Sequence, residues 1–299
     1  MPRRVTRRLA AGLAAAFCAG ALPALAQAPP AAAPGGVERH VGKMVFAELL
    51  TPDLAAAERF YGGLFGWTFR TVQAGGGPLT LVSAGGRVMA GLVQRDLPSG
   101  RHPAWLTCFA ASDVEAAQGV AVQGGAKLLY GPYGVATLGR EAVLADPQGA
   151  VFAVFAANAG DPPEQLAAPG DWIWSSLITT DPGADAAFYK ALFGYEAFTL
   201  PDTSDAQHLI LASGDFARAS VNPIPPARPD THPRWLSYVR VDDVAASAAK
   251  VEALGGRVVV PPRIDRHGGR ISVVADPTGA LFGLMEWSDD ADGDAGEVK

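Results

Sequence analysis

The carboxylate at position 48 is the residue of this sequence that most strongly suggests a functional site. Phe46, Glu48 and Leu50 alternate along an apolar stretch, so in a β-strand their side chains share one face. We assign that face to a cavity. Because an unpaired buried charge is costly, Glu48 pairs with Arg140, keeps a proton, or meets a cationic or hydrogen-bonding ligand. The pattern therefore indicates a small-molecule site around Glu48.

Other arrangements that could support chemistry are weaker. The sequence has no Gly-x-Ser-x-Gly elbow, no Cys/His pair and no His-Glu-x-x-His motif, so nucleophilic catalysis is not indicated. Gly75-Gly76-Gly77 lacks the Lys-Ser/Thr ending of a phosphate loop. Structural or solvent-exposed roles are favoured over metal binding for the histidines, which are His40, His102, His208, His232 and His267.

A long-range internal repeat sets the architecture. Four motifs return in the same order with an offset of 128 to 131 residues. They begin at Phe60 and Phe188, at His102 and His232, at Gly124 and Gly255, and at Asp146 and Asp276. The chain therefore holds two homologous units, residues 44–157 and 171–287, joined by a proline-containing linker at 158–170. In the second unit Ser176 replaces Glu48 while Arg270 matches Arg140, so the two cavities should differ chemically.

Each unit has a mixed α+β pattern. In the first, we expect a strand over 44–50 and then a helix that starts with Thr51 as N-cap and ends at Gly66. Strands follow near 67–72, 79–83 and 87–93. The order then repeats, with a strand from Trp105, a helix after the capping box Ser112-Asp113-Val114-Glu115, and strands near 127–130, 140–145 and 150–155. The chain thus reads as βαβββ four times, with paired modules that form a cup around a shared cavity.

This pattern resembles the vicinal oxygen chelate superfamily, which includes glyoxalase I, extradiol dioxygenases, fosfomycin-resistance enzymes and bleomycin-binding proteins. The most specific features are the Phe-Tyr-x-x-Leu-Phe-Gly-Trp helix end at 60–67 and the Asp-Pro-x-Gly-Ala hairpin from Asp146 or Asp276, with Arg140 or Arg270 upstream. The resemblance covers nearly the whole chain after the N-terminal segment. It implies two tandem domains of four βαβββ modules.

The resemblance also implies where a metal would bind. Metal-dependent members hold a divalent ion with His, Gln and Glu on inward-facing strand positions. Counted from the motifs, these positions are apolar in both units: Phe46, Leu106, Ala153, Trp174, Leu236 and Gly283. We therefore expect no metal and no other cofactor. If the alignment slips by a residue, Glu141 and Glu286 are the first alternative ligands.

The walls of the cups are less clearly marked. Four tryptophans, Trp67, Trp105, Trp174 and Trp235, are candidates for aromatic walls, and core packing is the alternative. For Arg140 and Arg270 the alternative to a ligand role is to brace the hairpin by pairing with Asp146 and Asp276. The full set of candidate cavity residues is Phe46, Glu48, Trp105, Arg140, Trp174, Ser176, Trp235 and Arg270.

The ends of the chain indicate export. Residues 1–26 read as a cleavable signal peptide, with arginines, an apolar run and Ala24-Leu25-Ala26; an uncleaved anchor is disfavoured because the apolar run is short. Residues 27–43 form a Pro/Ala-rich linker, and the acidic end, 288–299, is expected to be disordered. Cleavage after Ala26 removes four arginines and changes the net charge from −6 to −10, which argues against nucleic acid as a partner.

These observations favour a periplasmic or secreted protein that binds a small organic molecule in metal-free cups. The alternatives are a lyase- or oxygenase-like enzyme, using Glu48 and Arg140 or a misplaced metal site, and an interaction protein with vestigial cups. The mature chain keeps one cysteine, Cys108, which we expect to be a buried and inert thiol. We expect no stable membrane anchor, and a monomer in which the repeat forms an internal pseudo-dimer.

Overall fold

The first unit alternates strands and helices in the order that the sequence predicts. A computed structural model describes residues 37–287, except 75, 99–101, 200–207, 215, 227–230 and 266–268. The predicted signal peptide and acidic tail lie outside the described residues. The elements of the first unit are β1 (Met44–Thr51), α1 (Leu54–Phe65), β2 (Thr68–Ala74), β3 (Gly77–Ala84), β4 (Arg87–Gln94), β5 (Ala104–Ala110), α2 (Val114–Gln123), β6 (Lys127–Val135), β7 (Gly139–Ala145) and β8 (Val151–Ala157).

The second unit repeats this order. Its elements are β9 (Trp172–Thr179), α3 (Pro182–Phe193), β10 (Glu196–Thr199), β11 (Leu209–Ser213), β12 (Phe216–Pro223), β13 (Arg234–Arg240), α4 (Val244–Ala253), β14 (Arg257–Ile264), β15 (Arg270–Ala275) and β16 (Leu281–Met285). The predicted α+β class and the four βαβββ modules are confirmed. No helix among the described residues is long and apolar enough to span a membrane.

Each unit forms one eight-stranded sheet. The strand order in the first sheet is β2-β3-β4-β1-β5-β8-β7-β6, and the second sheet has the equivalent order β10-β11-β12-β9-β13-β16-β15-β14. The two modules of a unit join where β1 pairs antiparallel with β5, and where β9 pairs with β13. The curved face of each sheet that carries Phe46 or Trp174 is called here the first cup or the second cup.

Two helix starts differ from the sequence-based expectation by one or two residues. The N-cap of α1 is Asp53, whose side chain accepts a hydrogen bond from the Ala56 amide at 2.9 Å. The Thr51 hydroxyl oxygen accepts a hydrogen bond from the Asp53 amide at 3.3 Å. Asp113 caps α2 in the same way. A carboxylate that can reach the third amide of the helix replaces the predicted hydroxyl caps. At the end of α1, Gly66 has a φ of 72°, which favours glycine there.

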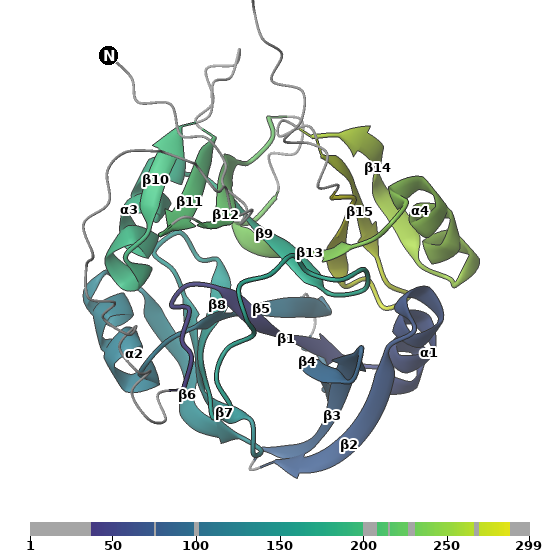
Figure 1. Ribbon diagram of the computed structural model, residues 1–299, viewed down its shortest axis with the longest axis horizontal. Helices are drawn as coiled ribbons and strands as arrows, with labels where there is room; N and C mark the ends of the chain where they lie inside the picture. The colour runs from purple at the N-terminus through teal and green to yellow at the C-terminus, as the bar shows by residue number, and fades with distance from the viewer. Residues whose placement is uncertain are drawn as a thin grey trace, which may run out of the picture.

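The two units share their hydrophobic cores. One core contains β1, α1 and β4 of the first unit together with α4, β15 and β16 of the second. The other contains α2 and β8 together with α3 and β11. Figure 1 shows α1 beside α4 at one side and α2 beside α3 at the other. Between the sheets, Thr107 on β5 lies 2.8 Å from its repeat equivalent Ser237 on β13. The sheets thus pack back to back, and each cup faces away from the other unit.

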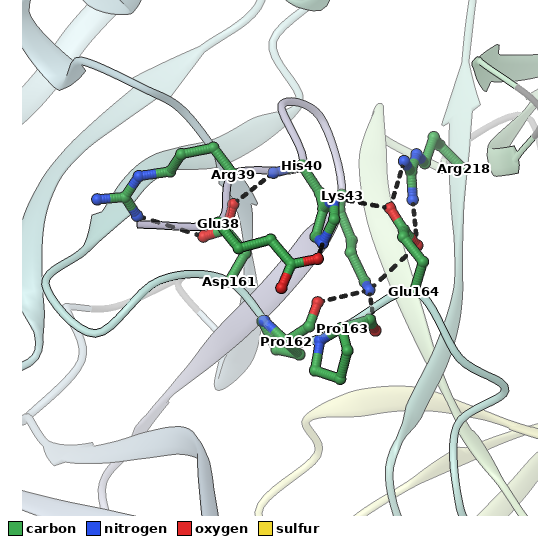
Figure 2. Close-up of polar contacts among 9 residues, drawn as sticks. All are labelled: Glu38, Arg39, His40, Lys43, Asp161, Pro162, Pro163, Glu164 and Arg218. Atoms are coloured by element: carbon green, nitrogen blue, oxygen red, sulfur yellow. Dashed lines mark hydrogen bonds and ion pairs between the residues drawn. The ribbon is translucent and has the colours of Figure 1, made fainter. Parts of the chain in front are cut away.

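A polar cluster ties the start of the described chain to the segment between the units (Figure 2). Lys43 donates to the carbonyl oxygens of Pro162 and Pro163 at 2.9 and 2.7 Å and lies 3.2 Å from Glu164. Arg218 on β12 binds both oxygens of Glu164. Burial alone would raise the pKa of Glu164, but Arg218 and Lys43 outweigh it and lower the pKa. Parts of both predicted linkers are therefore packed together.

Candidate functional site

The first cup encloses a cavity of about 300 Å³. Its walls are mostly aliphatic, with Leu79, Leu106 and Val143 among the lining side chains. The alternation predicted for the first strand places Glu48 on this wall, and Phe46 packs deeper in the same face against Phe155. Arg95 also lines the cavity and is exposed. The cup therefore offers an apolar space with very few ionisable groups.

A second carboxyl group lies beside the cavity wall. Glu141 on β7 is fully buried and accepts a hydrogen bond from the Tyr133 hydroxyl at 2.8 Å. The Cys108 sulfur on β5 lies 4.0 Å from its other oxygen. Glu48 is 7% exposed and has no hydrogen-bond or ion-pair partner among the described residues. Four side chains from four strands thus converge, and two of them are carboxyls.

Burial dominates the electrostatics of this group. Loss of solvent raises the pKa of Glu48 to about 7. The pKa of Glu141 is raised well above its ordinary range, first by burial and then by the charge of Glu48, against a lowering effect of the Tyr133 hydrogen bond. The pKa of the Cys108 thiol is raised by burial and by both carboxylates, so the prediction of a buried, unreactive thiol agrees with its surroundings. The two carboxyls titrate together, and near neutral pH they hold at least one proton.

Arg140 does not meet Glu48, which corrects one sequence-based expectation. Arg140 precedes Glu141 on β7, so strand alternation turns it to the opposite face, where it pairs with exposed Glu115 of α2. The bracing alternative is also wrong, because Arg140 does not contact Asp146. Arg270 is half exposed and lies 3.4 Å from Glu286 in place of the expected Asp276. Neither arginine lines a cup.

Trp105 and Trp235 also point away from the cups. They lie in the two shared cores, where each indole donates a hydrogen bond of 2.8 Å to a tyrosine, Tyr61 or Tyr189. Neighbouring Leu106 faces the first cup, so Trp105 on the same strand must face the helices. The expectation of aromatic walls at these two positions is corrected to core packing.

The same tyrosines explain why the repeat motifs recur. Tyr61 donates to Asp276 of the second unit at 3.2 Å, and Tyr189 donates to Asp146 of the first at 3.0 Å. Each aspartate also accepts amide hydrogen bonds from its own hairpin. The helix-end motif of one unit is therefore hydrogen-bonded to the hairpin motif of the other.

The second cup is built differently. Trp174 is buried there and stacks on Trp287, and Ser176 lies 2.8 Å from Ser220. The polar chain continues from Ser220 to Asn222 at 3.1 Å, and from Asn222 to His208 at 2.9 Å. Ser176 and Trp174 thus lie in the second cup as expected, and the described members of this hydrogen-bonded network include no carboxyl group.

The positions at which the superfamily binds metal do not fit a metal here. Phe46, Leu106 and Ala153 pack together in the first cup. In the second, a side chain at Gly283 would start 2.0 Å from the ring of Tyr238, which fills that space beside Trp174 and Leu236. Among the described residues, no group of three or more His, Cys, Asp or Glu side chains is arranged to hold a metal ion. Glu141 and Glu286 do not provide such a group.

Glu141, Tyr133 and Cys108 were not among the cavity residues selected from the sequence. The repeat carried a usable signal, because the equivalents of Glu141 and Cys108 in the second unit are Ile271 and Tyr238. A carboxylate at a strand position that is apolar in the other unit indicates a difference between the two cups. Its approach to Cys108 could not be read from the sequence, because β8 lies between β7 and β5.

Comparison with known proteins identifies both units. Residues 40–154 match the family model described as the glyoxalase/bleomycin resistance protein/dioxygenase superfamily. Residues 174–285 match the model described as a glyoxalase-like domain. CFP32 of Mycobacterium bovis, named as a candidate glyoxylase, is 30% identical over 253 residues, which cover 83% of this chain and 96% of that protein. The anthracycline biosynthesis protein DauV of Streptomyces sp. (strain C5) is 30% identical, covering 82% and 93%.

Solved structures share the fold. The Mn(II)-bound glyoxalase from Novosphingobium aromaticivorans has a TM-score of 0.60 at 17% identity, covering 83% of each chain. An extradiol ring-cleaving dioxygenase from B. fuscum has a TM-score of 0.61 at 14% identity, covering 87% of this chain and 76% of that one. At these identities the likeness concerns the fold alone.

Proposed function

Because this chain belongs to the glyoxalase/bleomycin resistance protein/dioxygenase superfamily, we propose that its first cup binds a small organic molecule without a metal ion. One observation carries the proposal: an apolar cavity of about 300 Å³ has Glu48 on its wall, while the expected metal positions hold apolar side chains. Ligand sites are typically apolar cavities with a few polar groups that orient the ligand. The name of DauV associates that relative with anthracycline biosynthesis, and an association with organic molecules agrees with the proposal.

A neutral fluorescent probe tests binding. N-phenyl-1-naphthylamine should gain fluorescence on binding to the full chain. Val143→Trp should abolish that gain, because the larger side chain fills the first cup. The matched control is Val273→Trp, since Val273 takes the same place on β15, opposite Gly283, that Val143 takes opposite Ala153. If Val273→Trp abolishes binding and Val143→Trp does not, the choice of the first cup is wrong.

The alternative function is an enzyme of the lyase or dioxygenase type with a non-standard metal site. Its support is the convergence of two carboxyl donors, Glu48 and Glu141, and the glyoxylase name of CFP32. Elemental analysis separates the two functions. Protein purified without added metal should contain no stoichiometric Zn, Ni, Fe or Mn. About one tightly bound ion per chain would overturn the metal-free proposal and favour the enzyme.

We also propose that the protein is exported. The basic start, the apolar run and Ala24-Leu25-Ala26 support cleavage after Ala26. N-terminal sequencing of protein from the periplasmic fraction should give a chain that begins at Gln27. An intact Met1 on protein that stays inside the cell would contradict export.

A further inference from the structure

The first cup contains a buried carboxyl group that lacks a partner. Glu48 is 7% exposed and lies on the cavity wall, yet the described residues give it neither a hydrogen bond nor an ion pair. Buried carboxyls are normally paired, because burying an isolated charge is costly. An unpaired group that faces an otherwise apolar space is therefore available to a ligand.

The groups around Glu48 favour a proton at this position. Glu141 is fully buried behind the cavity wall, and burial and the charge of Glu48 both raise its pKa, while burial raises the pKa of Glu48 itself. Burial and the nearby carboxylates raise the pKa values of Cys108 and Tyr133, so both side chains are neutral near neutral pH; Tyr130 also lines the cavity wall. The one cation that lines the cavity among the described residues is exposed Arg95, and it forms no ion pair with either carboxyl. Two electrostatically interacting carboxyls with no cation paired to either retain protons to higher pH than exposed carboxyls do.

We propose that the first cup selects a neutral, largely apolar molecule with a carbonyl oxygen, and that Glu48 donates its carboxyl proton to this oxygen. The inference rests on the proposed function and names its ligand class. A carbonyl oxygen has lone pairs and no proton, so it satisfies a carboxylic acid without adding charge to the apolar wall. The positive charge of Arg95, which also lines the cavity, repels a cationic ligand.

Three probes of nearly equal shape distinguish the possible ligand classes. They are 2-acetylnaphthalene, which has a carbonyl oxygen, 2-ethylnaphthalene, which has no polar group, and 2-(aminomethyl)naphthalene, which is a cation. Affinities for the full chain are measured by titration calorimetry at about pH 6 and about pH 8.5, on either side of the pKa of Glu48, which burial raises to about 7. At the lower pH the ketone should bind ~10-fold more tightly than the hydrocarbon, and at the higher pH this preference should disappear.

Two substitutions of Glu48 separate the effect of its carboxyl proton from that of the shape of the cup. Glu48→Gln keeps an N–H donor that does not titrate, so the ketone preference should persist at both pH values. Glu48→Leu removes the donor, so the preference should be lost at both while the hydrocarbon still binds. The control is Asp185→Asn, which removes a buried carboxyl on α3 outside the cup and should leave the ketone preference and its pH dependence unchanged.

Each alternative result has a defined meaning. Equal binding of ketone and hydrocarbon at the lower pH overturns this inference but leaves the proposed function standing. Tightest binding of the ammonium probe at the higher pH, lost in Glu48→Leu, shows that the cup selects cations and overturns it as well. If none of the probes binds and N-phenyl-1-naphthylamine does not bind either, both the inference and the proposed function fail.

Discussion

Replacing Glu48 by glutamine should stabilise the protein above neutral pH and change its stability little in acid. Burial raises the pKa of Glu48 from 4.5 to about 7 in the folded protein. Between these values the folded chain keeps a proton that the unfolded chain has lost, so the free energy of unfolding falls as pH rises. The contribution is fully present below the unfolded pKa and is lost as pH passes the folded pKa.

The size of the effect follows from that difference in pKa. Each pH unit corresponds to about 1.4 kcal/mol, so ionising Glu48 in the folded state costs about 3 kcal/mol. Glutamine resembles the protonated carboxyl in shape and does not ionise. At about pH 8 the variant should therefore be more stable than the wild type by up to about 3 kcal/mol, and at about pH 4.5 the two should be nearly equal.

Urea unfolding at both pH values measures this difference. Glu252→Gln is the matched control, because it makes the same substitution at a glutamate that is exposed on α4. If Glu48→Gln and the wild type lose the same stability between the two pH values, Glu48 is not the buried, unpaired group that the structure shows. The inference that Glu48 donates its carboxyl proton to a ligand would then fail as well.

Three further substitutions test other parts of the structure. Tyr189→Phe should destabilise the protein by about 2 kcal/mol in urea unfolding, because Asp146 and Trp235 each lose a buried hydrogen-bond partner; an unchanged midpoint would refute the inter-unit contact. Asp185→Asn should raise the melting temperature at about pH 8 more than at about pH 5, since burial raises the pKa of Asp185 to about 7; equal shifts would contradict this. Arg140→Ala should change stability by less than about 1 kcal/mol and leave N-phenyl-1-naphthylamine binding unchanged, because its ion pair is exposed; weaker binding would restore Arg140 to the site.

The architecture could be predicted from the sequence alone. The repeat predicted two homologous units, and the strand and helix patterns predicted four βαβββ modules. Residues two apart on a strand share a face, so the alternation of Phe46 and Glu48 was enough to place Glu48 on the wall of a cavity. The expected metal positions could be located by counting residues from local motifs, because these motifs keep fixed distances along the chain. The residues at those positions are apolar.

The tertiary structure decided which groups meet across strands and across units. Arg140 and Trp105 were assigned to the cups, but each lies next to a residue that faces the cup, and a one-residue error in a strand exchanges the two faces. The Tyr61–Asp276 and Tyr189–Asp146 contacts join the two units, and no spacing within one unit encodes them. Glu141 reaches Cys108 across the intervening strand β8, so this contact depends on the register of three assembled strands rather than on any single strand.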